Sequence, residues 1–308
     1  MEFFRRTTKI DFLRIRSITA VLSCLVVVAS IVCLCIKGIN WSLDFTGGIV
    51  VELGYKEEAP LPKIRSILQS ANYHEAIVQS FGSPKEVIIR LAARKDTDEK
   101  VIAQDIIKLL TNDGTAVELR RVDAIGAQVG AELAEQGSLA IFVALIATMI
   151  YIAMRFETRF AVSAAVALAH DPIVILLIFS LFQIEFDLTT LAGILAVIGY
   201  SLNDTIVVFD RVKENFIKLR KASPLEIVNL SINQTLSRTI MTSGLTLLVV
   251  IALLIFGGPT LRGFSLSLFI GILVGTYSSI YIAGALALAL GLNKADLLPK
   301  KKEVDYLP

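Results

Sequence analysis

The chain has 308 residues, of which 55% are hydrophobic and 19% are charged. Together with a mean hydropathy of +0.69, this composition excludes an ordinary soluble globule and predicts a polytopic α-helical membrane protein. The formal net charge of +2 is too small to indicate a partner, so only the positions of the basic residues along the chain are informative.

Six apolar stretches reach the roughly 17 to 25 residues that a helix needs to cross the hydrocarbon core of a bilayer. The first stretch is longer than the apolar region of a usual signal peptide and ends without a small-x-small cleavage site, which favours an uncleaved anchor over a cleaved signal peptide. The last stretch is long enough to tilt or to end early. We therefore predict six transmembrane helices, at residues 17–36, 138–154, 161–182, 188–209, 239–256 and 264–290.

Residues 37–137 have an ordinary soluble composition and are predicted to form a small α+β domain. The pattern predicts strands at 49–53, 76–80, 86–91 and 115–122, and helices at 60–71 and 97–112. Thr97 is the expected N-cap of the second helix, Asn112-Asp113-Gly114 its stop, and Gly82-Ser83-Pro84 the turn between the middle strands. The order βαββαβ is that of a ferredoxin-like split fold, which is a scaffold and not a function.

This domain contains no Ser-His-Asp, Cys-His or phosphate-loop pattern, so we do not expect an enzymatic active site or a cofactor. The three cysteines, Cys24, Cys33 and Cys35, all lie in the first span, where a free thiol behaves as a small hydrophobe. Nothing in the chain indicates a metal site, and the domain must be held together by its own core without disulfides.

Basic residues gather on one side of the predicted spans. In the opposite loops, 183–187 and 257–263, the only basic residue is Arg262. The positive-inside rule therefore places both termini in the cytoplasm and the α+β domain outside. Contact with nucleic acid is a weaker explanation, because the basic residues lack the interleaved aromatic side chains of a base-stacking surface. The residues that set the orientation are Arg5, Arg6, Lys9, Arg14, Arg16, Arg155, Arg159, Arg211, Lys213, Lys218, Arg220, Lys221, Arg238, Lys294, Lys300, Lys301 and Lys302.

These observations predict the organisation of the whole chain. Residues 225–232 within the fourth-to-fifth loop have apolar side chains at helical spacing, which favours an amphipathic segment lying on the membrane. The predicted parts are a cytoplasmic basic tail (1–16), a first span (17–36), an extracytoplasmic domain with its connection (37–137), a five-span bundle (138–290) with a cytoplasmic loop (210–238), and a cytoplasmic tail (291–308).

An Asn203-Asp204 pair lies inside the fourth apolar stretch. A carboxylate there costs about 2.5 to 3.5 kcal/mol on insertion scales, and such residues commonly relay protons or bind ions. A nearby guanidinium favours the charged form whereas burial favours the neutral form, so making and breaking a contact between Asp204 and Arg238 would load and release a proton. The alternatives are a static polar contact between helices for Asp204 and a positive-inside anchor for Arg238.

Two further motifs are candidates. His170 and Asp171 lie in the third span before Pro172, where they would either hand protons along or satisfy the backbone carbonyl that the proline frees. Asp44, Gly47 and Gly48 follow the first span and are predicted to form a tight turn that joins it to the domain, because glycine permits positive φ and aspartate caps free amides.

Five sequence blocks cover nearly the whole chain in one order. They are WSLDFTGG at 41–48, ALAHD at 167–171, GYSLND at 199–204, QTLSRT at 234–239 and GFSLSL at 263–268. In this order, and with six spans, they resemble the SecF family, whose members are subunits of the bacterial Sec protein translocase and are similar to resistance-nodulation-division (RND) transporters.

The resemblance implies a function. SecF pairs with SecD in an RND-like complex of the bacterial inner membrane, with its domain in the periplasm, and uses the proton-motive force to draw preproteins out of the SecYEG channel. The implied partners are SecD, SecYEG with YajC and YidC, and the translocating preprotein, with no nucleic acid. By position, the family's proton-relay aspartate matches Asp204 and its functionally important arginine matches Arg238. SecD would supply another intramembrane aspartate.

Two other classes of function remain as alternatives. A stand-alone small-molecule/proton antiporter of the RND type usually needs two six-span halves and larger extracytoplasmic domains, whereas this chain has one six-span half and one small domain. A scaffold that only stabilises translocase partners would leave Asp204 without a task. The sequence does not distinguish H⁺ from Na⁺ as the coupling ion.

Overall fold

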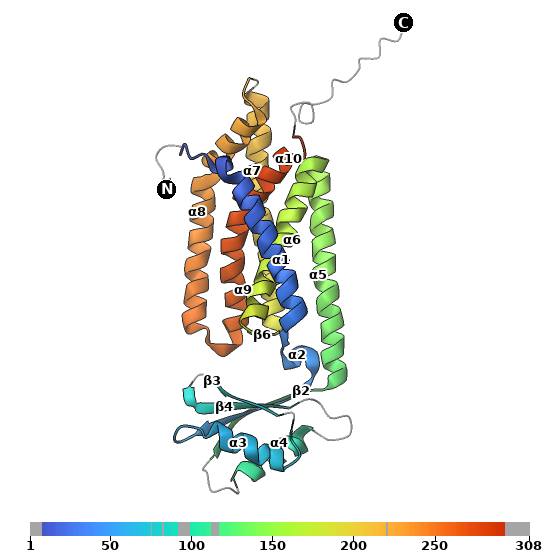
Figure 1. The fold of residues 1–308 in the computed structure, drawn as a ribbon, viewed down its shortest axis with the longest axis vertical. Helices are drawn as coiled ribbons and strands as arrows, with labels where there is room; N and C mark the ends of the chain where they lie inside the picture. The colour runs from blue at the N-terminus through green and yellow to red at the C-terminus, as the bar shows by residue number, and fades with distance from the viewer. Residues whose placement is uncertain are drawn as a thin grey trace. The chain divides into compact units, whose positions relative to one another are not determined.

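The computed structural model describes residues 8–74, 76–81, 83–91, 99–111, 117–219 and 221–292. Within these ranges the chain forms two compact units, one helical and one built around a sheet (Figure 1). The helical unit comprises the residues up to 39, residues 141–184 and those from 189 onward. The sheet unit comprises residues 40–140 and 185–188, so it includes the beginning of the helix that follows the sheet.

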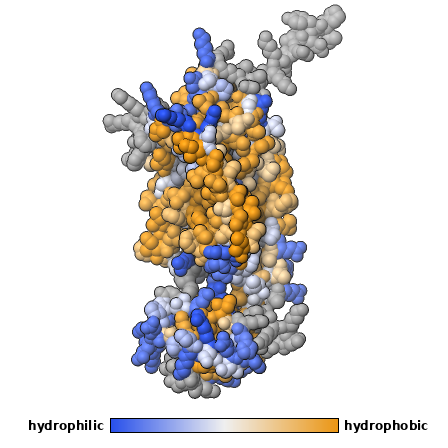
Figure 2. All heavy atoms as spheres, in the orientation of Figure 1, coloured by the Kyte–Doolittle hydropathy of each residue, from blue (hydrophilic) through white to orange (hydrophobic). Residues whose placement is uncertain are grey.

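Six helices within the described ranges are long and apolar enough to cross a membrane, which confirms the prediction of a six-span helical protein. Figure 2 shows apolar side chains over most of the visible surface of the helical unit and many hydrophilic ones on the sheet unit. The helical segments are η1 (Phe12–Ile15), α1 (Arg16–Lys37), α5 (Ala127–Arg155), α6 (Thr158–Leu181), α7 (Leu188–Lys218), α8 (Pro224–Phe256), α9 (Gly258–Tyr277), the π-helical segment η2 (Ser278–Ala283) and α10 (Gly284–Ala289).

Helices α5, α7 and α8 extend furthest beyond the apolar stretches that predicted them. Helix α5 begins at Ala127, so residues 127–137, which were predicted to be a connection, are helical. Helix α7 continues to Lys218 and α8 begins at Pro224, so the loop predicted at 210–238 is mostly helix. Hydropathy detects only the apolar part of such helices, because Lys, Arg, Glu and Gln are good helix formers that continue the helix beyond it.

The start of α8 corrects the prediction of a segment lying on the membrane surface. The Ser223 side chain accepts a hydrogen bond from the Glu226 backbone, and the Glu226 side chain accepts one from the Ser223 backbone, which together form a capping box. The apolar side chains that suggested an amphipathic segment include Ile227, Val228 and Ile232, which are buried in the core of the helical unit. This stretch is therefore the first part of a long packed helix.

Helices α7 and α9 approach closely at small residues. A Cβ atom added to Gly271 would lie 2.1 Å from a methyl carbon of Val197, and one added to Gly193 would lie 2.8 Å from Ser267. Gly275 faces Ser201 in the same way. Such residues let helix backbones pack tightly in membranes, and here they bring α9 and the adjoining η2 segment against the helix that carries Asp204.

The sheet unit has the predicted ferredoxin-like topology. Its sheet has the order β3-β4-β2-β5, and each neighbouring pair is antiparallel. Two split βαβ units therefore interleave, as in the ferredoxin-like fold. The elements are β2 (Gly48–Tyr55), α3 (Leu61–Ser70), β3 (Ile77–Phe81), β4 (Ser83–Leu91), α4 (Glu99–Thr111) and β5 (Val117–Ile125).

Buried apolar side chains that alternate along the strands form the core of this unit. Ile49, Val51 and Leu53 are fully buried in β2, and they share a core with Ile64 of α3 and Ile106 of α4. Ser83 and Pro84 belong to β4 and not to a turn, because β4 begins earlier than the apolar run predicted. Thr97, Gly82 and residues 112–114, to which caps and turns were assigned, lie outside the described residues.

Candidate functional site

Asp204 lies on α7 at a junction with two other helical segments. Its Oδ1 accepts a hydrogen bond from Thr239 Oγ1 of α8 at 2.5 Å, and its Oδ2 accepts one from Ser279 Oγ of η2 at 2.5 Å. Both donors are neutral hydroxyl groups, and the Asp204 side chain is half-buried. The carboxyl group that the sequence singled out thus joins three elements of the helical unit through oxygen–oxygen contacts.

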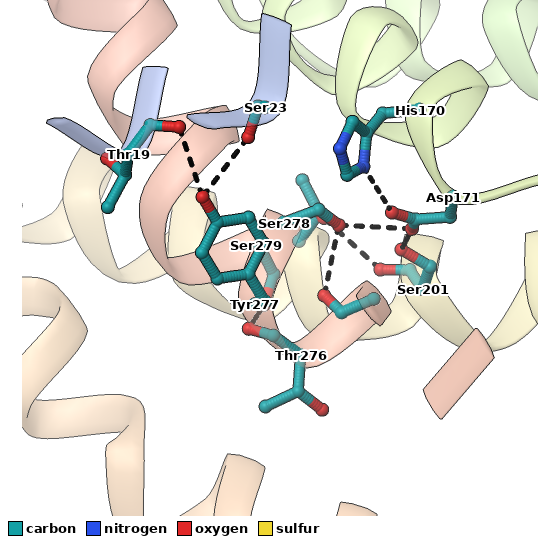
Figure 3. A network of polar contacts seen from close by, with 11 residues as sticks. Thr19, Ser23, His170, Asp171, Ser201, Thr276, Tyr277, Ser278 and Ser279 are labelled. Carbon is teal, nitrogen blue, oxygen red and sulfur yellow. Dashed lines mark hydrogen bonds and ion pairs between the residues drawn. The ribbon is translucent and has the colours of Figure 1, made fainter. Parts of the chain in front are cut away.

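Asp171 on α6 is the centre of a second cluster (Figure 3). Its Oδ2 accepts hydrogen bonds from Ser201 Oγ of α7 at 2.5 Å and from Ser278 Oγ of η2 at 3.0 Å. Its Oδ1 lies 3.3 Å from His170 Nδ1. Asp171 is fully buried and His170 is 7% exposed, so the His-Asp pair forms a contact inside the bundle.

The two clusters meet at η2, because Ser278 and Ser279 are consecutive residues that reach different carboxyl groups. Ser201, Thr239 and these two serines were not predicted as site residues from the sequence. The available signal was weak: Ser201 precedes Asp204 by three residues, which places both on one face of α7. The serine pair in the last span had no neighbouring charge to mark it.

A band of hydroxyl groups continues from these clusters toward other helices. The Tyr277 hydroxyl donates to the Thr19 carbonyl oxygen and lies 3.1 Å from Ser23 Oγ, both on α1 (Figure 3). Ser243 Oγ of α8 lies 2.8 Å from Thr276 Oγ1 of α9. Hydroxyl groups can both donate and accept, so they can stabilise a carboxyl group in either protonation state.

Arg238 and Asn203 do not join these clusters. Both side chains are exposed on the helical unit, and no ion pair joins Arg238 to an acidic side chain among the described residues. The next residue, Thr239, makes the contact with Asp204 instead. The predicted contact between Asp204 and Arg238 is therefore not formed in this structure.

The segment that contains Asp44, Gly47 and Gly48 makes a turn within the sheet unit. Gly47 has φ of +66° and Gly48 has φ of +136°, which agrees with the predicted need for glycine. Asp44 lies in the short helix α2 (Leu43–Thr46), whose N-cap is Ser42. The Asp44 Oδ2 atom accepts a hydrogen bond from the Leu188 backbone N–H at 2.9 Å, so Asp44 caps α7 and not its own turn.

Other contacts hold this segment against the α6–α7 connection. Strand β1 (Asn40–Trp41) pairs in parallel with β6 (Glu185–Phe186). The rings of Trp41, Phe45 and Phe186 pack together with centroids 5.3 to 5.9 Å apart. Residues 40–45 are therefore held against residues 185–188 within the sheet unit.

Replacing Asp44 tests this cap. An Asp44→Ala variant should lose about 1 kcal/mol of local stability at the start of α7, because the Leu188 amide loses its acceptor. Asp44→Asn keeps a side-chain oxygen and should remain close to wild type. Hydrogen–deuterium exchange of the first turn of α7 measures the difference, and equal exchange in the alanine variant and the wild type would show that the cap contributes nothing.

Comparisons with known proteins agree with the motifs and the fold. Two family descriptions match: "Protein export membrane protein SecD/SecF, C-terminal" over residues 105–293 and "SecD/SecF GG Motif" over residues 34–59. The chain is 51% identical to the "Protein translocase subunit SecF" of Vibrio alginolyticus, with 98% of this chain and 96% of that one covered. It is 46% identical to the Pseudomonas aeruginosa protein of the same name, with 97% and 98% covered.

A solved structure is also similar. The chain resembles SecDF, a translocon-associated membrane protein from Thermus thermophilus, with a TM-score of 0.83 and 34% sequence identity. The alignment covers 94% of this chain but only 39% of that one. The matched part makes up less than half of the solved SecDF chain, so most of that chain has no counterpart in this one.

Proposed function

The chain belongs to the SecF family of protein-translocase subunits, and from that premise we propose that it works with SecD to couple the proton-motive force to preprotein movement. The site of coupling in this proposal is Asp204. SecD supplies the second half of the transmembrane assembly, SecYEG supplies the channel through which the preprotein passes, and YajC and YidC are further partners of this assembly. The chain lies in the bacterial inner membrane with both termini in the cytoplasm and the sheet unit in the periplasm.

The observation that carries the proposal is the setting of Asp204 in the bundle. A carboxyl group held by two hydroxyl donors from different segments, Thr239 and Ser279, can bind or release a proton while the hydroxyl hydrogens reorient. The change of charge alters how strongly α8 and η2 are held to α7. A group placed only to join helices would not need to be ionisable.

The energy that one proton releases on crossing the membrane is enough to bias a conformational equilibrium. One charge that crosses a potential of 100 mV releases about 2.3 kcal/mol, which changes a population ratio about fifty-fold. This is too little to unfold a stable domain, whose stability is typically about 5 to 15 kcal/mol. We therefore infer a ratchet, in which protonation at Asp204 changes the position of the periplasmic domain and favours outward movement of the preprotein.

A polar face of the helical unit supports SecD as the intramembrane partner. Asn203 and Gly199 lie four residues apart on one face of α7, where the Asn203 side chain is exposed and a Cβ atom on Gly199 would meet open space. Arg238 on α8 is exposed as well. Polar side chains facing lipid are costly, whereas small and polar residues together suit contact with another transmembrane helix. In our proposal SecD covers this face.

Cross-linking tests the partner. In a background without the three native cysteines, a cysteine at Asn203 should form a disulfide with cysteines placed in SecD transmembrane helices, and the two chains should copurify. A cysteine at Val28, which is exposed on α1, is the matched control and should not cross-link at the same SecD positions. Failure of the chains to copurify, or equal cross-linking from both positions, would contradict SecD pairing through this face.

An Arg238→Lys variant distinguishes a coupling role of Arg238 from a role as a topology anchor. Lysine keeps the charge but loses the planar fork, so Arg238→Lys should reduce gradient-dependent translocation roughly tenfold if the guanidinium binds a carboxylate during the cycle. Translocation assays in membrane vesicles measure this, with the accessibility of the chain termini as the topology control. Normal activity of the lysine variant would make Arg238 only an anchor.

A further inference from the structure

The η2 segment is a single π-helical stretch, Ser278–Ala283, between α9 and α10. π-Helical turns are rare and occur frequently at functional sites, because the wider turn changes the direction of the side chains that it carries. In a regular α-helix, consecutive side chains point about 100° apart. Here two consecutive serines bind two different carboxyl groups, Ser278 to Asp171 on α6 and Ser279 to Asp204 on α7.

A second link runs along α7 itself. Ser201 donates to the Asp171 carboxylate, and Asp204 lies three residues later on the same face of the helix. Each carboxyl group is therefore connected to both α7 and η2. A shift of η2 relative to α7 cannot change the contacts of one carboxyl group without affecting the other.

Each serine also has an alternative acceptor. Ser278 Oγ lies 3.1 Å from the Gly275 carbonyl oxygen, and Ser279 Oγ lies 3.1 Å from the Thr276 carbonyl oxygen. When a carboxylate gains a proton, it can donate to the serine oxygen while the serine hydrogen turns to the backbone carbonyl. Both serines thus have two hydrogen-bonding arrangements, one for each protonation state of the adjacent carboxyl group.

We propose that Ser278 and Ser279 are positioning residues that link Asp171 to Asp204, so that a change of protonation at one carboxyl group alters the other. This inference rests on the proposed role of Asp204 and extends it to Asp171. The fully buried Asp171 then has a function beyond packing around Pro172: it sets the protonation behaviour of the coupling site through the π-helical turn.

Few other titratable groups face the two clusters. Asp171 is faced by His170 from its own helix, and Tyr277 lies beside His170 with ring centroids 6.4 Å apart. Arg238 precedes Thr239, the α8 residue that binds Asp204, and Tyr200 of α7 binds Ser243. From α1, Thr19 and Ser23 contact the Tyr277 hydroxyl group, and neither of these side chains titrates. The coupling test must therefore keep His170 and Arg238 unchanged.

Infrared difference spectroscopy tests the link. The complex of this chain with SecD in lipid vesicles is titrated with acid, and the Asp204 carboxyl band is assigned by its absence in Asp204→Asn. Asp171→Asn should move the titration midpoint of the Asp204 band by about one pH unit, which corresponds to a tenfold coupling. In Ser278→Ala or Ser279→Ala backgrounds the same substitution should move that midpoint much less, because only the link through Ser201 remains.

Matched variants separate positioning from general packing. Ser278→Thr and Ser279→Thr keep the hydroxyl group and should keep the coupling, and they replace the alanine variants if those do not fold. Ser265→Ala removes a fully buried hydroxyl group of α9 that has no hydrogen-bond partner, so it should leave the coupling unchanged. Loss of coupling in this control as well would overturn the specific role of Ser278 and Ser279.

The outcomes distinguish this inference from the proposed function. If no Asp204 band titrates, both the ion-coupling role of Asp204 and the link fail. If Asp204 titrates and its replacement abolishes gradient-dependent translocation, but Asp171→Asn leaves the Asp204 midpoint in place, only the link is wrong. A midpoint shift that persists undiminished in both serine-to-alanine backgrounds would likewise overturn it.

Discussion

An Asp204→Asn variant is expected to insert, fold and copurify with SecD, yet lose the gradient-dependent part of preprotein translocation. Asparagine has nearly the same shape and its amide oxygen can still accept a hydrogen bond from Thr239 or Ser279. It cannot titrate, so the site would remain in one charge state throughout the cycle. Translocation into inverted membrane vesicles, measured with and without a protonophore, reports the effect.

The matched control for this variant is Asp210→Asn on the same helix. Asp210 is partly exposed and forms an ion pair with Arg155 at 2.8 Å, an arrangement that is typically worth less than 1 kcal/mol. The control should keep the response to the gradient. Wild-type translocation by Asp204→Asn would contradict the proposed role of the site and favour a scaffold that does not transduce energy.

A Gly48→Ala variant should destabilise the sheet unit by several kcal/mol. Its Cβ atom would lie 2.3 Å from the Leu91 carbonyl oxygen and 2.9 Å from a Leu43 methyl carbon, and φ of +136° is strained for any L-residue. Backbone strain costs about 1 to 3 kcal/mol and overpacking typically adds about 1 to 3 kcal/mol. Protease resistance and thermal unfolding of the full chain measure the loss.

Gly38→Ala separates strain from steric overlap. Gly38 also has positive φ, +68°, but no atom lies within 4 Å of a Cβ atom built there. The free energy of unfolding of this variant should therefore fall only by the cost of backbone strain, so the variant should remain more stable than Gly48→Ala. Equal stability of the two variants would show that the contact between the Gly48 position and β4 is not a constraint.

Much of the fold follows from periodicity and hydropathy. The six spans and the βαββαβ order could be predicted because burial patterns such as that of Ile49, Val51 and Leu53 repeat with the period of their element. The helical spacing at 225–232 was recognised but assigned to a segment on the membrane surface, although Ser223-Pro224 and Glu226 are the start signal of a longer helix. Apart from Arg238, which was also a candidate partner of Asp204, the basic residues in this stretch were interpreted as topology signals.

The candidate site was only half predictable. Acidic residues in apolar stretches are conspicuous, so Asp204 and Asp171 were identified, whereas serine and threonine in a membrane helix are ordinary small residues. Their role depends on which helices meet, and the π-helical turn that aims Ser278 and Ser279 has no sequence signal that we recognise. The Asp44 cap could not be predicted either, because its partner Leu188 lies 144 residues away.

The most direct test of proton coupling uses vesicles that contain this chain, SecD and SecYEG, with a preprotein stalled in the channel after ATP is removed. A proton gradient directed from the periplasmic face to the cytoplasmic face of the membrane is then imposed. Release of the preprotein at the periplasmic face is timed. We expect the gradient to accelerate release, replacement of Na⁺ with choline to leave this acceleration unchanged, and Asp204→Asn to abolish it. Release at the same rate with and without the gradient, or acceleration that requires Na⁺, would contradict it.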